Sequence, residues 1–516
     1  MPTRQTSKYV VVKEYNEPIQ APDLSFKSWL RWIWKQVTSM KLAIILLLLL
    51  AAAAIPGSIF PQRSADPNGV TLYFRNNPTS APVLDKLQLF DVYSSSWFSS
   101  IYLLLFISLI GCVLPRVGVH YKALRAEPPL APTNLERLPE YKKIETTNSI
   151  DVAVEYLRSK RYKVIATKKD IRAEKGYLRE TGNLIFHISL IGVLISVGLG
   201  SALSFSGQRV LVEGDTFVNN EASYDSLSPG LLYKTSDLTP FSLHLDSFWT
   251  KYDLLNPTNY GIPIDFTATV TSKLPSGKTQ KSDIKVNQPL IMPNAKVYLT
   301  GNGFAPVLEI KDPDGSISFS GPVVFLPQDK NLTSLGVIKV PDAKKQFGMA
   351  AFFYPTVGKL STGALTSVYP YPVDPVLTMN VFEGSLGLES GLNSNAFELN
   401  THAMKQIAGG KSGTKAIMLA PGMTKALPDN LGTVKFVGFK RYASLDITYN
   451  PGEIWVLLFA ILVLLGLIMM LITPRRRIWV RKTATHIEIG ALAKSRDEML
   501  GKIVKELAKQ IKKKSK

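Results

Sequence analysis

Three side chains that could bind a metal or an anion lie in or beside apolar segments of this 516-residue chain. His187 interrupts the apolar run TGNLIFHISLIGVLISVGLGSA, and Cys112 lies near the end of WFSSIYLLLFISLIGCVLP, with Arg116 directly after it. Imidazole and thiolate are both iron ligands in haem proteins. A guanidinium suits a carboxylate or a phosphate. These three residues are therefore the candidates for a binding site.

Each candidate also has a purely structural interpretation. A neutral histidine in a span can hydrogen-bond a neighbouring helix, although ionisable residues there usually face a partner, a cavity or a ligand. A buried cysteine is mostly a small hydrophobe, and an arginine that ends a span is mostly an interfacial anchor. From the residues alone both interpretations stay open, and ligation is the weaker one for Cys112.

Four apolar segments must position these residues: 42–60, 97–115, 182–203 and 453–473. Each has about 19 to 22 residues, the length of a helix that crosses roughly 30 Å of hydrocarbon. The first begins far from the N-terminus and is not followed by an A-x-A-like cleavage site, so we do not expect a signal peptide. We expect an α+β integral membrane protein with four transmembrane helices and a large β-rich extracytoplasmic domain between the third and fourth.

The distribution of charge predicts the orientation of the spans. Residues 1–41, 116–181 and 474–516 hold 36 Lys and Arg against 16 Asp and Glu, which accounts for the whole net charge of +20. Because Lys- and Arg-rich loops stay in the cytoplasm, we expect both termini there. The expected cytoplasmic parts are the N-terminal segment 1–41, the loop 116–181 and the basic tail 474–516; the expected outer parts are the loop 61–96 and the domain 204–452. This basic excess beside the spans argues against nucleic-acid binding.

In this orientation the candidate residues share one depth. At about 1.5 Å per residue, His187 lies roughly 8 Å into the inner half of the bilayer. Cys112 lies at the same depth, because its span runs inward and ends near Pro115. The other histidines are weaker candidates: His120 just inside the membrane, His244 on a polar strand face, His402 in an irregular stretch and His486 in the tail.

Turn signals predict a β-sandwich or a barrel-like fold for the domain 204–452. PSGKTQ separates FTATVTSKL from KSDIKVN, DPDGS separates APVLEIK from ISFSGPVVFL, and VDPVLTMNVFEG has strand character. AKKQFGMAAFFYP and residues 393–415 are less regular and are expected as surface excursions. The domain has no cysteine, so it has no disulfide or thiol chemistry of its own.

The expected cytoplasmic parts contain regular patterns as well. IDVAVEYLRSK has helical spacing, and YKVIAT followed by IRAEKGYL predicts a short hairpin. Apolar residues at helical spacing from 500 to 511 indicate either a basic amphipathic helix on anionic lipid or a solvated, frayed tail. No hydrolytic or nucleotide-binding motif occurs in the chain.

With these motifs and this order of segments, the chain resembles the ResB family, also called CcsB, of cytochrome c biogenesis proteins. IPGSIFPQ is similar to the family's Gly-x-x-x-Pro-Gln ending of the first span, SLIGCVLPR to its Ser-Leu…Cys…Arg pattern, and GNLIFHISLIGVL to its Gly-x-x-x-x-His signature. The matching residues are Gly57, Pro61, Gln62, Cys112, Arg116, Gly182 and His187. The resemblance covers nearly the full length, although the β-rich domain contributes little to it.

The resemblance implies a haem-handling role in a bacterial cell membrane, or in a thylakoid membrane if the source is photosynthetic. The subunit would bind haem b and help to present it for thioether attachment to the CxxCH motif of apocytochrome c outside the membrane. His187 would be an axial ligand of the haem iron, and Cys112 and Arg116 would be further cofactor-binding residues. The subunit would be an accessory or non-catalytic part of a cytochrome c haem lyase complex.

The resemblance also implies partners. This chain has no WGxxWxWD-like stretch, so the other half of the complex would be a ResC/CcsA-type, tryptophan-rich multispan membrane protein. Apocytochrome c and a thioredoxin-like thiol reductant would be further partners. An alternative function is an assembly scaffold that holds the apocytochrome and a haem-carrying partner without binding haem. A transporter is disfavoured, because no inverted repeat is visible.

Overall fold

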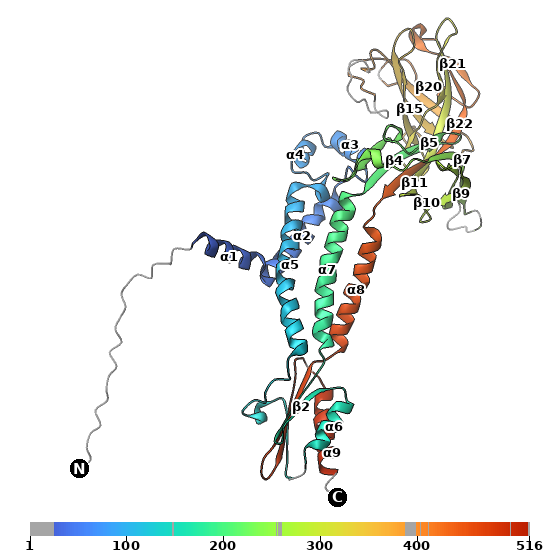
Figure 1. Cartoon of the computed structure of the whole chain (residues 1–516). Helices are drawn as coiled ribbons and strands as arrows, with labels where there is room; N and C mark the ends of the chain where they lie inside the picture. Colours follow the sequence, from blue (N-terminus) through green and yellow to red (C-terminus); the bar gives the residue numbers. More distant parts are fainter. Residues whose placement is uncertain are drawn as a thin grey trace. The chain divides into compact units, whose positions relative to one another are not determined.

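The computed structural model describes residues 25–146, 149–253, 255, 261–387, 399–402, 404–410, 412–495 and 497–513. The chain divides into two compact units, one of Met1–Ile195 with Trp455–Lys516 and the other of Ser196–Ile454. Figure 1 shows long helices and a small sheet domain in the first unit, and a second unit rich in strands.

Four helices among the described residues are long and apolar enough to cross a membrane: α2 (Met40–Ile59), α5 (Ser96–Arg125), α7 (Leu178–Ala202) and α8 (Glu453–Ile472). They coincide with the four apolar segments of the sequence. The largest difference is at the end of α5, which continues past Pro115 to Arg125 instead of ending at the proline. Helices α2 and α7 begin two and four residues earlier than expected. Proline is tolerated inside apolar helices. Lys122 and Arg125 in the last turn stabilise the helix, because their positive charges lie at the negative end of the helix dipole.

Close contact between α7 and α8 depends on glycine. A side chain at Gly182 would overlap the backbone of Gly466, and a side chain at Gly192 would overlap the ring of Phe459. Small residues allow apolar helices to approach closely enough for van der Waals contact. Gly182 of the third-span signature is therefore a packing residue.

Gln62 organises the segment between α2 and α5, which contains the short helices α3 (Pro67–Asn76) and α4 (Ala81–Lys86). Its buried amide donates to the carbonyls of Phe60 and Leu89, both at 3.0 Å, and accepts from the N–H of Val92 at 2.9 Å. Because buried polar groups need such partners, Gln62 of the Pro-Gln motif holds this corner together.

The small domain of the first unit combines segments from both ends of the chain. Its antiparallel sheet has the order β1-β24-β23-β3-β2. The strands are β1 (Glu140–Ile144), β2 (Lys163–Ala166), β3 (Asp170–Lys175), β23 (Arg476–Lys482) and β24 (Ile487–Ala493). The predicted hairpin is β2–β3, and the predicted helix is α6 (Asp151–Ser159).

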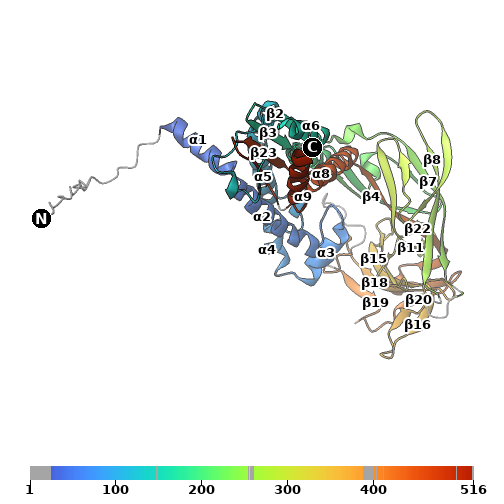
Figure 2. The same cartoon turned by 90° about the horizontal axis from the view of Figure 1, so that it is seen from below.

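The C-terminal segment is neither a lipid-bound helix nor a frayed tail. Helix α9 (Met499–Lys513) buries Leu500, Val504, Leu507 and Ile511 in the core of this domain, together with residues of β1, β3, β23, β24 and α6. The helical spacing is confirmed, but the apolar face of the helix packs on the sheet of the same chain. The described residues of 140–175 and 476–513 thus contribute to one folded body. Figure 2 shows α9 and α6 beside the sheet.

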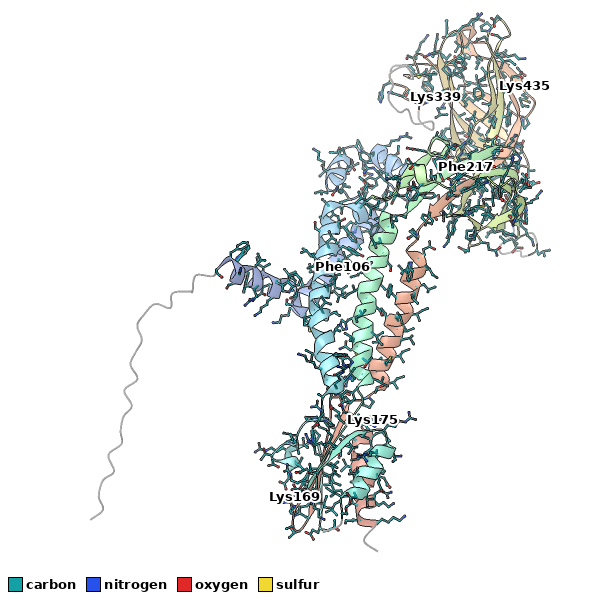
Figure 3. All side chains as sticks on the ribbon, in the orientation of Figure 1. Phe106, Lys169, Lys175, Phe217, Lys339 and Lys435 are labelled. Atoms are coloured by element: carbon teal, nitrogen blue, oxygen red, sulfur yellow. The ribbon has the colours of Figure 1, made fainter. Side chains whose placement is uncertain are left out.

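A buried carboxylate joins the small domain to the beginning of α7. Glu174 accepts hydrogen bonds from Arg475 (2.8 Å), Arg477 (2.7 Å) and the hydroxyl of Tyr177 (2.8 Å). Burial would raise the pKa of Glu174, but these donors outweigh it and keep the pKa below its ordinary 4.5. In Figure 3, Lys169 marks the far end of β3 and Lys175 the end next to the helices, where this cluster lies.

The second unit is built on two long paired strands, β11 (Ala295–Lys311) and β22 (Thr433–Tyr449). They belong to the sheet β10-β11-β22-β4-β6, to which β12 and β21 add at β11 and β22. The other strands of this sheet are β4 (Phe205–Val212), β6 (Ser226–Pro229), β10 (Leu290–Met292), β12 (Ile317–Pro322) and β21 (Thr424–Ala426).

Two further sheets pack on the ribbon formed by the paired strands β11 and β22. The sheet β5-β7-β8-β9 shares a core with Val297 and Leu445 near one end of the ribbon, and the sheet β13-β14-β15-β18-β19 shares a core with Leu308 and Phe436 near the other. The first has β5 (Thr216–Val218), β7 (Ser242–Tyr252), β8 (Pro263–Lys273) and β9 (Thr279–Lys285). The second has β13 (Leu326–Pro327), β14 (Ser334–Val340), β15 (Phe347–Tyr354), β18 (Val376–Glu383) and β19 (Lys405–Ala408), with β20 (Ile417–Leu419) on β18; β16 (Val357–Lys359) pairs with β17 (Leu365–Ser367).

The predicted turns fall between the observed strands: PSGK of the stretch PSGKTQ lies between β8 and β9, which begins at Thr279, and DPDGS lies between β11 and β12. One expectation was wrong. FGMAAFFY is not a surface excursion but strand β15, which pairs with β14 and β18 on its two edges and is largely buried. Of the expected excursion 393–415, residues 405–408 form β19, while residues 393–398, 403 and 411 lie outside the described residues.

Candidate functional site

A pocket between α2, α5 and α7 brings the three candidate residues together. Its lining consists of Met40, Ala43, Ile44, Leu47, Leu105, Leu109, Cys112, Val113, Arg116, His187, Leu190, Val193 and Leu194. Cys112, Arg116 and His187 are the lining residues with an ionisable head, and all the others are apolar. Cys112 and His187, 75 positions apart in the chain, thus share one cavity with an apolar wall.

The helix α7 itself fixes the chemical form of His187. The Nδ1 atom lies 2.7 Å from the backbone carbonyl oxygen of Asn183, one turn earlier. A carbonyl only accepts hydrogen bonds, so Nδ1 carries the proton and Nε2 keeps a free lone pair. This arrangement is typical of histidines that ligate metals through the other ring nitrogen. His187 is therefore prepared to act as a ligand or as a hydrogen-bond acceptor through Nε2.

Arg116 offers a positive charge at the same pocket. Its Nη2 atom lies 2.6 Å from the Sδ atom of Met40 on α2. No carboxylate of the described residues forms an ion pair with it. A thioether is a weak acceptor, so the guanidinium keeps most of its capacity to bind a carboxylate in two-point geometry.

Cys112 is engaged differently. Its Sγ atom donates to the backbone carbonyl of Thr38 at 2.7 Å, so the sulfur carries a proton and is a neutral thiol in this arrangement. A thiolate is the form that ligates metals. Iron ligation by Cys112 would require the loss of both the proton and the bond to Thr38, whereas His187 needs no such change.

The chemistry of the lining suits a mostly apolar ligand with an anionic edge. The pocket has a cavity volume of about 270 Å³ and is open on one side, so it lies at the small end of ligand pockets, which range over roughly 300–1,000 Å³. Haem has an apolar macrocycle, an iron that accepts a nitrogen lone pair, and propionates that suit an arginine. The apolar walls, the Nε2 atom of His187 and the Arg116 guanidinium match these three needs.

The other histidines do not line this pocket. His120 is buried and its Nε2 lies 3.0 Å from the hydroxyl of Thr181 on α7, while its Nδ1 has no partner among the described residues. His244 pairs with the hydroxyl of Thr216, and His486 with that of Thr485. His402 lies in a loop.

The sequence did not indicate the contribution of α2 and of the residues before it. Met40, Ala43, Ile44 and Leu47 form one wall, and Thr38 binds Cys112. A run such as LAIILLLLLAAAA is apolar on every side, so no periodicity distinguishes a pocket wall from a lipid-facing surface.

Comparison with known proteins identifies a family and several similar proteins. Residues 40–505 match the model of the ResB-like family. Cytochrome c biogenesis protein CcsB of Gloeobacter violaceus is 30% identical over 271 residues, which cover 50% of this chain and 54% of that protein. CcsB of Microcystis aeruginosa is 27% identical over 300 residues, 54% of this chain and 62% of that protein.

A relative with a different name extends the match. Cytochrome c biogenesis protein Ccs1 of Heterosigma akashiwo is 25% identical over 309 residues, which cover 58% of this chain and 68% of that protein. The chain thus spans about half to two thirds of the length of the curated relatives that it matches.

Proposed function

Because the chain belongs to the ResB-like family, we propose that it handles haem as a membrane subunit in cytochrome c biogenesis. The observation that carries this proposal is His187, whose Nε2 lone pair is free in a pocket otherwise lined by apolar residues, Cys112 and Arg116. Relatives named for cytochrome c biogenesis support the choice of haem over other ligands.

Each part of the pocket has a role in this proposal. His187 donates the Nε2 lone pair to the haem iron as an axial ligand, and its bond to Asn183 keeps the ring in the required tautomer. Arg116 binds a propionate. The aliphatic side chains of α2, α5 and α7 pack on the macrocycle and exclude water. Cys112 contributes an uncharged part of the wall while its thiol donates to the carbonyl of Thr38.

The subunit acts together with other proteins in this proposal. A ResC/CcsA-type membrane protein supplies the opposing haem ligand, and haem b is the cargo that the complex delivers for thioether attachment to apocytochrome c. The β-rich unit lies outside the membrane and meets the apocytochrome and a thioredoxin-like reductant there. The compartment is the bacterial cell membrane or a thylakoid membrane, with both termini cytoplasmic.

The proposal is tested by cytochrome c maturation in cells that supply the partner, together with the haem content of the purified complex. His187→Ala should abolish both holocytochrome c and bound haem while the protein level stays unchanged. His244→Ala, which removes an imidazole from the β-rich unit, should leave both at wild-type level. Cys112→Ala should have a mild effect, because its thiol is already engaged by Thr38.

The scaffold function predicts another pattern. A protein that only holds the apocytochrome and a haem-carrying partner should tolerate His187→Ala, since the span inserts equally well without a polar group. Normal maturation and an unchanged haem spectrum in this variant would therefore reject haem binding by this chain.

A further inference from the structure

Helix α1 (Phe26–Val37), which precedes the first span, has two chemically distinct faces. Its apolar residues share one face and its basic residues share the opposite one. The apolar set is Phe26, Trp29, Leu30, Ile33 and Val37, and the basic set is Lys27, Arg31 and Lys35. Trp32 and Trp34 lie at the two borders between these faces. Tryptophan beside lysine and arginine is typical of helices that lie in the interface of a bilayer.

The apolar face of α1 is open in the described part of the chain. The exposed fractions of Phe26, Trp29 and Leu30 are 75%, 47% and 53%, and no residue of α1 is buried. Figures 1 and 2 both show α1 pointing away from α2 and α5. A contiguous apolar surface of this kind indicates an interaction with a membrane or a protein.

We propose that α1 lies in the headgroup layer of an anionic bilayer leaflet, with its apolar face toward the acyl chains. Only Thr38 and Ser39 separate α1 from α2, so the helix is held at the membrane surface where its span begins. It contains three basic residues and no acidic residue, which complements the phosphates of anionic lipids. The lipid surface thereby covers the face that the chain leaves open.

This placement has a consequence for the pocket. The carbonyl of Thr38, at the end of α1, accepts the hydrogen bond of the Cys112 thiol. A side chain at Gly111 would overlap the methyl group of Thr38, and the ring of Trp34 lies 3.5 Å from the same point. The corner between α1 and α2 therefore rests on α5 at the Cys112 side of the pocket. The lipid-bound α1 positions this corner.

The chain offers a direct test, because Cys112 is its sole cysteine. In the full chain with Cys112→Ser, which keeps a hydroxyl donor for Thr38, a single cysteine is introduced by Leu30→Cys or by Ser28→Cys. These neighbouring positions lie on the apolar and the polar face. Each is labelled with an environment-sensitive fluorophore and reconstituted in vesicles of phosphatidylcholine alone or mixed with phosphatidylglycerol, with or without brominated acyl chains.

In the mixed vesicles the label at position 30 should emit at shorter wavelength and be quenched several-fold more by brominated chains than the label at position 28. Adding Lys27→Gln, Arg31→Gln and Lys35→Gln should remove the increase in quenching at position 30 that phosphatidylglycerol causes. Equal, water-like emission from both labels would overturn the proposal. So would quenching that is the same in both lipid compositions, or a buried label at position 30 only when a partner protein is co-purified.

Discussion

His187, Cys112 and Arg116 show how far single residues can be interpreted before a structure is known. An ionisable residue in an apolar segment is conspicuous, so the sequence predicts all three as candidates, and the structure places them around one pocket. Their chemical states could not be predicted. The proton position on His187 depends on the carbonyl of Asn183, and that on Cys112 depends on Thr38, 74 positions earlier in the chain.

Arg116→Gln should weaken the binding of haemin to the purified chain by about ten- to a hundredfold, because a hydrogen bond to a charged group contributes about 1.5–3 kcal/mol. The haemin affinity of Arg116→Lys should lie between those of the wild type and Arg116→Gln, since lysine keeps the charge but not the two-point geometry. The measurement is an absorbance titration with haemin. Arg125→Gln is the matched control, because Arg125 lies on the same helix and stacks on Tyr121, 4.2 Å from the ring centre. Equal losses at both positions would contradict a specific role for Arg116.

At the scale of elements, the sequence predicts those whose pattern is local. The four spans follow from their length, and the hairpins from their turns. Strand β15 was missed because it lies between two other strands and is apolar on both faces, so FGMAAFFY shows no clear alternation. The extension of α5 past Pro115 was missed because proline usually ends a helix.

Two glycines of α5 provide a matched pair at this scale. Gly111→Ala should push the Thr38 corner away, because a methyl group there overlaps the Thr38 side chain, whereas Gly118 has no atom within 4 Å of the equivalent position. Loss of the bond to Thr38 exposes the Cys112 thiol. The rate of Cys112 modification by a maleimide in detergent should therefore rise in Gly111→Ala and stay unchanged in Gly118→Ala. Identical rates in the two variants would show that the corner does not shield the thiol.

At the scale of the whole molecule, pairings between distant segments set the limit of prediction. Strand β3 pairs with β23 across some 300 residues of sequence, and α9 closes the core that they share. Nothing in the local pattern of 474–516 indicates this partner. The charge balance of the segments, by contrast, is a global property that can be counted from the sequence.

Glu174 should make the joint between the small domain and α7 sensitive to acid. Its pKa is lower in the folded protein than its ordinary 4.5, so its stabilising effect is complete at neutral pH and is lost as the pH falls below about 4.5. Glu174→Gln should lower the stability at pH 7 by about 2 kcal/mol, because Arg475 and Arg477 lose a charged acceptor while Arg475 keeps its ion pair with Glu180. Thermal unfolding in detergent across pH measures both effects. Asp170 lies on the same strand as Glu174 and is an exposed partner of Arg481, so Asp170→Asn should have little effect on stability. A loss of stability equal to that of Glu174→Gln would contradict the account.

The orientation of the chain is tested by reporter fusions. Fusions at Lys143 and Lys513 should report the cytoplasm, and a fusion at Lys281 the opposite side, because the excess of positive charge is confined to the parts of the chain that contain the first two positions. An external signal from Lys143 together with a cytoplasmic signal from Lys281 would reverse the orientation. It would then place His187 in the outer half of the bilayer.

The central claim is that the Nε2 atom of His187 ligates haem iron, and replacing the imidazole by a soluble one tests it most directly. Haemin is titrated into the purified chain carrying His187→Gly, with and without free imidazole, and the absorbance of the bound haem is recorded. We expect binding to be lost in the variant and restored by imidazole, because a free ligand can occupy the vacated coordination position, whereas a packing defect gives it nothing to coordinate. Wild-type affinity and an unchanged spectrum in His187→Gly without imidazole would show that His187 is not the ligand.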